Sequence, residues 1–80
     1  MKKIELDISL YNKMVLETKQ NDDYEQAKMA AIFLKKNFPN NTFSDFMQAA
    51  YKYAPGNSDM IQFRMFFEVE LRRLFELPIQ

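Results

Sequence analysis

The sequence predicts a small all-α protein: a single domain, residues 1–80, built as a bundle of four short helices behind a flexible or extended N-terminal arm. Three observations support this fold class. Apolar residues recur at helical spacing, side chains suited to helix N-caps precede the apolar segments, and polar or proline-containing breaks separate them. A chain of 80 residues is the length of one domain.

The first half of the chain predicts two helices, at about 8–19 and 23–37. Residues 3–8 alternate polar and apolar as a strand does, but we interpret them as a lead-in to the first helix. Asp7 or Ser9 can cap that helix and Asp22 the second. The expected core stripes are Ile8, Tyr11, Met14, Val15 and Thr18 in the first helix, and Ala27, Ala30, Ala31, Leu34 and Phe38 in the second.

The second half predicts helices at about 43–54 and 59–77. Thr42 and Asp45 have the spacing of a capping box, a turn follows at 54–57, Asn57 or Ser58 can cap the last helix, and Pro78 ends it. The core stripes are Phe43, Phe46, Met47, Ala50, Tyr53 and Ala54, and then Met60, Phe63, Phe67, Leu71 and Leu74. The four tyrosines are expected to pack with their hydroxyl groups outward.

The residue types that are missing exclude most common chemistry. The chain has no Cys or His, so the usual ligands of zinc, copper and haem are absent, as is an imidazole base for a nucleophile. Gly56 is the only glycine, which excludes the glycine-rich phosphate loops. Asp22, Asp23 and Glu25 lie at a helix start, where carboxylates are stabilised without a metal. We therefore expect no enzyme, no cofactor, no metal and no small-molecule substrate.

Charge and composition indicate where the protein acts. The formal net charge is zero, which argues against the nucleic-acid backbone as the main partner. No apolar run is long enough to span a membrane, and residues 1–6 lack the apolar run of a signal peptide, so we expect a cytoplasmic protein. Residues with AT-rich codons predominate over those with GC-rich codons, which indicates an AT-rich source; a phage or other mobile element fits, as does a low-GC bacterium.

The predicted last helix carries more apolar residues than one core stripe needs. Ile61, Met65 and Val69 are spaced i, i+4, i+8 and lie away from its core face, and Phe66 lies on a third side. Such a helix is either central in its bundle or shared with a partner. Because a domain this small can hardly bury one helix on every side, we predict a partner.

The resulting hypothesis is a non-enzymatic protein-binding module, an accessory subunit, inhibitor or regulator. Its predicted contact residues are Ile61, Met65, Phe66 and Val69, joined by Met29 and Phe33 from the second helix. Two alternatives remain open. One is a structural homo-oligomer, such as a dimer through the last helix. The other is a nucleic-acid-binding regulator, similar to a helix-turn-helix protein, that uses Lys28, Lys35, Lys36 and Lys52.

Overall fold

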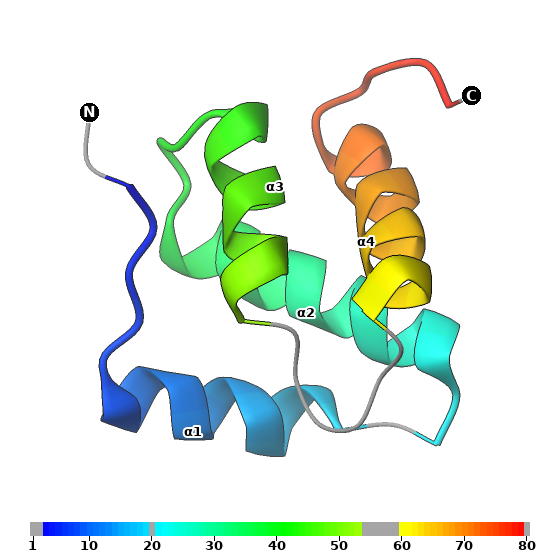
Figure 1. Ribbon diagram of the computed structural model, residues 1–80. Helices are drawn as coiled ribbons and strands as arrows, with labels where there is room; N and C mark the ends of the chain where they lie inside the picture. Colours follow the sequence, from blue (N-terminus) through cyan, green and yellow to red (C-terminus); the bar gives the residue numbers. More distant parts are fainter. Residues whose placement is uncertain (1–2, 20, 54–59, 80) are drawn as a thin grey trace.

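The structure, a computed structural model, describes residues 3–19, 21–53 and 60–79, and over these residues the chain is helical with no strand (Figure 1). Its helices are α1 (Ile8–Thr18), α2 (Asp23–Asn37), α3 (Phe43–Lys52) and α4 (Met60–Leu74). The predicted all-α bundle is confirmed. The predicted turn at 54–57 and the proposed caps Asn57 and Ser58 lie outside the described residues.

The N-termini of α1, α2 and α3 are set by local side-chain caps. Asp7, rather than Ser9, caps α1 by accepting a hydrogen bond from the Leu10 N–H at 2.7 Å. Asp22 accepts from the Glu25 N–H at 3.2 Å. These bonds satisfy backbone donors that have no partner inside the helix, so the sequence fixes where each helix begins.

At α3 the predicted capping box is present. The Asp45 N–H donates to Thr42 Oγ1 at 3.2 Å, and the Thr42 N–H donates to Asp45 Oδ2 at 3.0 Å. The Thr42 N–H, with the Asn41 side chain, favours the charged carboxylate and lowers the pKa of Asp45 below its usual value. The box therefore ties the α2–α3 connection to the first turn of α3.

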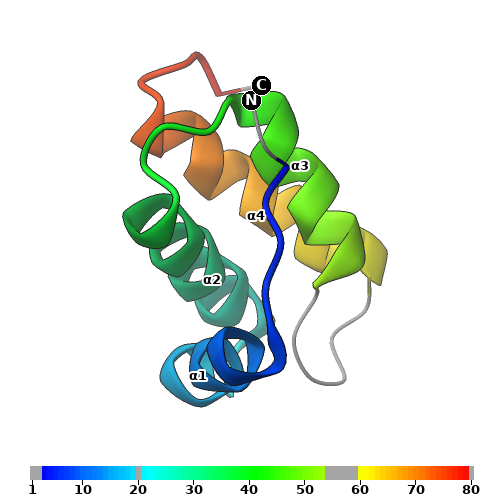
Figure 2. The same ribbon diagram turned by 90° about the vertical axis from the view of Figure 1, so that its left-hand side faces the viewer.

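Helix α2 is the centre of the bundle. It packs against α1, α3 and α4, whereas α4 packs against α2 and α3. Figure 2 shows α2 lying between α1 and α4. Ala27, Ala30 and Ala31 on α2 are all buried, and their small side chains allow the neighbouring helices to approach closely.

The core is made largely by the predicted stripes of α2, α3 and α4. Its largest fully buried side chains are Phe46, Phe63, Phe67, Met14, Leu34, Leu71 and Thr18. The stripe expected for α1 needs one correction, because Ile8 is 82% exposed. The inward line of α1 is Leu10, Met14 and Thr18, spaced i, i+4, i+8, and Ile8 lies off that line.

The N-terminal arm, residues 3–7, is extended and runs along α3 (Figures 1 and 2). Its Ile4 side chain is 4% exposed and belongs to the core. The Leu6 N–H donates to the Tyr53 hydroxyl at 3.0 Å. The tyrosine hydroxyl was expected to point outward, but it faces the arm instead. The lead-in to α1 is thus a packed part of the fold.

Helix α4 ends at Leu74, three residues before the predicted end at 77. The Leu77 N–H donates to the Arg72 carbonyl at 2.7 Å and the Glu76 N–H to the Arg73 carbonyl at 3.1 Å, while Glu76 has a φ of 57°. This is the Schellman arrangement, which normally places glycine at the position that Glu76 occupies. The sequence does not predict this helix end, because the glycine that usually marks it is absent from position 76.

Glu76→Gly should stabilise the protein relative to Glu76→Ala by about 1 kcal/mol. A side chain with a Cβ in the left-handed region costs about 1–2 kcal/mol, and the larger backbone entropy of unfolded glycine offsets part of the gain. Urea denaturation of the two variants gives the difference in unfolding free energy. An alanine variant as stable as the glycine variant would refute the assigned helix end.

Tyr53→Phe should lower the free energy of unfolding by about 0.5–1.5 kcal/mol and speed amide exchange at Leu6, because one partly buried hydrogen bond is lost. Tyr51→Phe, two residues earlier in the chain, is the matched control, since the Tyr51 side chain is exposed. Unchanged exchange at Leu6 in the Tyr53 variant would show that the arm does not depend on this bond.

Candidate protein-docking surface

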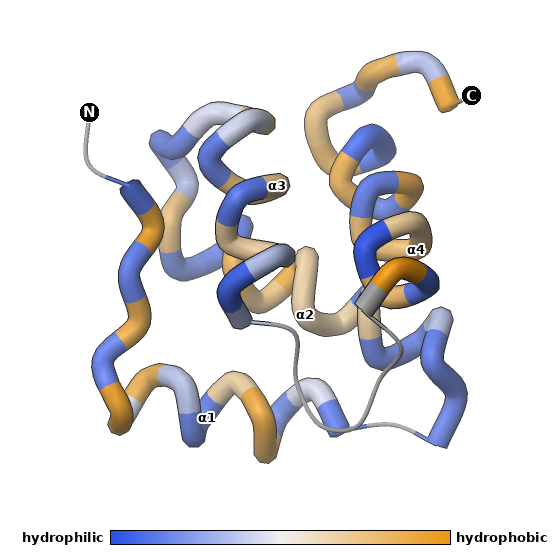
Figure 3. The backbone as a smooth tube through the Cα atoms, in the orientation of Figure 1, coloured by the Kyte–Doolittle hydropathy of each residue, from blue (hydrophilic) through white to orange (hydrophobic). Residues whose placement is uncertain are grey.

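Three apolar side chains form a line along α4, away from the side of the helix that Phe63, Phe67 and Leu71 bury in the core. Ile61 is 66% exposed and Met65 is 59% exposed, while Val69 is half-buried. Their i, i+4, i+8 spacing places them on one face, which we call the outer stripe. Figure 3 shows apolar and polar positions alternating along α4. The helix therefore presents apolar surface outward as well as toward the core.

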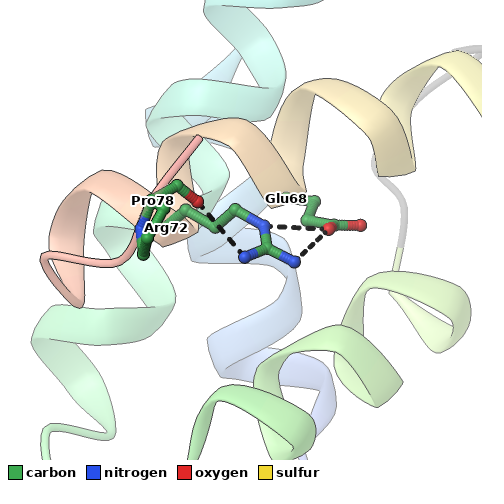
Figure 4. A network of polar contacts seen from close by, with 3 residues as sticks. All are labelled: Glu68, Arg72 and Pro78. Atoms are coloured by element: carbon green, nitrogen blue, oxygen red, sulfur yellow. Dashed lines mark hydrogen bonds and ion pairs between the residues drawn. The ribbon is translucent and has the colours of Figure 1, made fainter. Parts of the chain in front are cut away.

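A polar network fixes the C-terminal end of the outer stripe (Figure 4). Glu68 Oε2 accepts a hydrogen bond from Arg72 Nε at 3.0 Å and forms an ion pair with Arg72 Nη2, also at 3.0 Å. Arg72 Nη1 donates to the Pro78 carbonyl at 3.3 Å, which holds the chain that follows α4. Glu76 lies beyond the end of the helix and does not extend this pair by another turn.

This network leaves a shallow groove lined by Met65, Phe66, Glu68, Val69 and Arg72. The charge of Arg72 is matched by Glu68 within the groove, and the two side chains hold each other in place. The apolar walls are therefore bordered by ordered polar groups, as is common at protein–protein interfaces.

Two of the predicted contact residues face their own protein instead. The Phe66 ring packs edge-on against Tyr24 of α2, with ring centroids 5.2 Å apart, and is half-buried. Phe33 is 7% exposed and belongs to the core. The sequence pattern could not show this, because both rings are covered by residues from other helices.

Met29 lies apart from the outer stripe. It is half-buried and lines a separate hollow between α1 and α2, together with Glu17, Thr18, Ile32, Phe33 and Lys36. The six predicted contact residues are thus not one surface. Ile61, Met65 and Val69 stand together, Phe66 lines one wall of their groove, and Met29 and Phe33 belong elsewhere.

One exposed pair next to the outer stripe was not predicted. The Arg64 guanidinium lies over the ring of Tyr51 on α3, 4.4 Å from its centroid. Tyr51 is exposed, and tyrosine and arginine are enriched among residues that dominate binding energy. Because the two residues come from different helices, only the packing of α3 beside α4 reveals the pair.

The lysines of the nucleic-acid alternative differ in exposure, since Lys36 and Lys52 are exposed and Lys28 and Lys35 are half-buried. Lys35 Nζ donates to the Pro39 carbonyl at 3.2 Å and lies 5.1 Å from the centre of the Phe75 ring. Lys52 lies over the ring of Tyr53, the residue that follows α3. In both views α3 and α4 run in opposite directions (Figures 1 and 2).

In the part of the chain that the structure describes, no three or more carboxylates are grouped so that they could hold a metal ion. Glu70 is buried and its Oε1 has no hydrogen-bond partner, which costs stability. No helix among these residues is both long and apolar enough to cross a membrane. No protein-family model, curated protein or solved structure matches the chain.

Met65→Asp and Phe66→Asp should differ sharply in stability although the residues are adjacent. Met65→Asp should lower the free energy of unfolding by about 0.5 kcal/mol, mainly through the lower helix propensity of aspartate, because Met65 is exposed. Phe66→Asp should lower it by about 2 kcal/mol or more, because the packing of Phe66 on Tyr24 is lost. Thermal and urea unfolding measure both values. Equal costs would mean that the stripe residue is buried too.

Proposed function

We propose that the chain is a non-enzymatic, cytoplasmic protein-binding module that docks through the outer stripe of α4 and acts as an accessory subunit, inhibitor or regulator. The observation that carries the proposal is the exposure of Ile61 and Met65 on a helix whose core face is already filled by Phe63, Phe67 and Leu71. Apolar side chains in excess of the core's needs, gathered on one face, are typical of an interaction site.

The chemistry of the stripe supports a protein partner. Methionine is flexible and polarisable, so Met65 can fit apolar surfaces of different shape. The Glu68–Arg72 pair is held in place before any partner arrives, which reduces the ordering that binding requires. The AT-rich composition is compatible with a phage or mobile-element protein that acts on a host protein.

Self-association through α4 would use the same stripe. Self-association, unlike docking on another protein, can be measured with the purified chain alone, because the molecular mass then rises with concentration. Sedimentation equilibrium separates the two cases: a monomer at high concentration favours a different protein as partner, and a dimer lost on Met65→Asp favours a second copy.

The direct test is affinity capture from the source cells with three matched baits: the wild-type chain, Met65→Asp and Leu16→Asp. Leu16 is 78% exposed on α1, so its substitution introduces the same charge at an exposed apolar site away from α4. We expect wild type and Leu16→Asp to retain the same protein and Met65→Asp to lose it. Retention by Met65→Asp at the wild-type level contradicts the proposal.

A further inference from the structure

The outer stripe is bordered by arginines on both sides. At about 100° per residue, Arg64 lies about 60° to one side of Ile61, and Arg73 lies about 40° beyond Val69 on the other side. Arg72 follows in line with the stripe, one turn after Glu68. Any helix that lies along the stripe therefore has a guanidinium group near each of its flanks.

The two flanking arginines form no ion pair within the part of the chain that the structure describes. Within the described residues, Arg72 is ion-paired with Glu68, while neither Arg64 nor Arg73 has a carboxylate partner. Stacking of Arg64 on Tyr51 uses the face of the guanidinium and leaves its N–H edge free to donate. Arg73 is exposed. Of the described acids near them in sequence, Glu68 is already paired, Glu70 is buried, and Glu76 lies beyond the helix end.

We propose that the occupant of this surface is an acidic amphipathic helix of a protein partner. Its apolar residues, at i, i+4 spacing, lie on Ile61, Met65 and Val69, and its carboxylates accept hydrogen bonds from Arg64 and Arg73. This is helix-on-helix recognition with charge-assisted bonds at the rim. The inference rests on the proposed docking function and adds the chemistry of the partner.

Charge favours this occupant over a second copy of the chain. Two α4 helices paired through their stripes would bring together two sets of flanking arginines, and the Glu68 of each copy is already matched by its own Arg72. Like charges placed together at an interface oppose association. A partner helix with acidic flanks replaces that repulsion with two attractive contacts.

The test uses two synthetic helical peptides with identical leucines at i, i+4 spacing, one with glutamates on the flanks and one with lysines. Fluorescence anisotropy measures their binding to the full chain. We expect the acidic peptide to bind at least about tenfold more tightly than the basic one, and its affinity to fall as salt is raised. Arg64→Glu/Arg73→Glu should weaken the acidic peptide about tenfold or more and strengthen the basic one.

The matched control is Lys13→Glu/Lys19→Glu, which makes the same change in net charge at exposed positions on and just after α1, away from α4. It should bind both peptides as wild type does. If the reversed arginine pair fails to fold by circular dichroism, Arg64→Gln/Arg73→Gln serves for the same comparison.

Several results overturn the inference: no binding of the acidic peptide, equal binding of the two peptides, or an unchanged affinity after charge reversal. Tight binding to phosphatidylserine vesicles with none to the acidic peptide would identify an anionic membrane instead, and self-association that excludes the peptide would identify a second copy. In each case the docking function is judged separately, by whether Met65→Asp loses the captured protein.

Discussion

The small side chains on α2 are the constraint on which the arrangement of the helices depends. Ala27, Ala30 and Ala31 occupy the face where α2 meets its neighbours, and all three are buried. Alanine adds little bulk, so α2 can contact α1, α3 and α4 at once. The large rings of Phe46, Phe63 and Phe67 then fill the volume around it, in a chain with neither disulfide nor His or Cys metal ligands.

Placing α2 at the centre leaves α4 at the edge, and this explains the unusual pattern of α4. A helix with apolar residues on several sides is normally central, but here the buried side of α4 faces the core, Phe66 packs on Tyr24 of α2, and Ile61 and Met65 of the outer stripe stay exposed. Arg72 places a positive charge on that exposed face, and its ion pair with Glu68 balances this charge. The two arginines without such a partner then give the surface a preference for acidic groups.

The sequence predicted the helices well because their caps and periodicity are local. Asp22 and the Thr42–Asp45 capping box form hydrogen bonds only with residues close to them in the chain, so the sequence alone predicts these caps. The features that the sequence could not predict depend on contacts between residues that are far apart in the chain. The exposure of Ile8, the burial of Phe33 and the Tyr53 hydroxyl bond to the arm all follow from which helix neighbours which.

The most direct test of the central claim is the solvent accessibility of the methionine methyl groups, measured by NMR with a soluble paramagnetic agent. In the free chain the Met65 methyl signal should be strongly attenuated, while that of Met14, which is fully buried, should persist. Addition of the captured partner should protect Met65. A Met65 methyl that is as protected as Met14 in the free monomer, or one that stays accessible in the complex, would contradict a docking surface on α4.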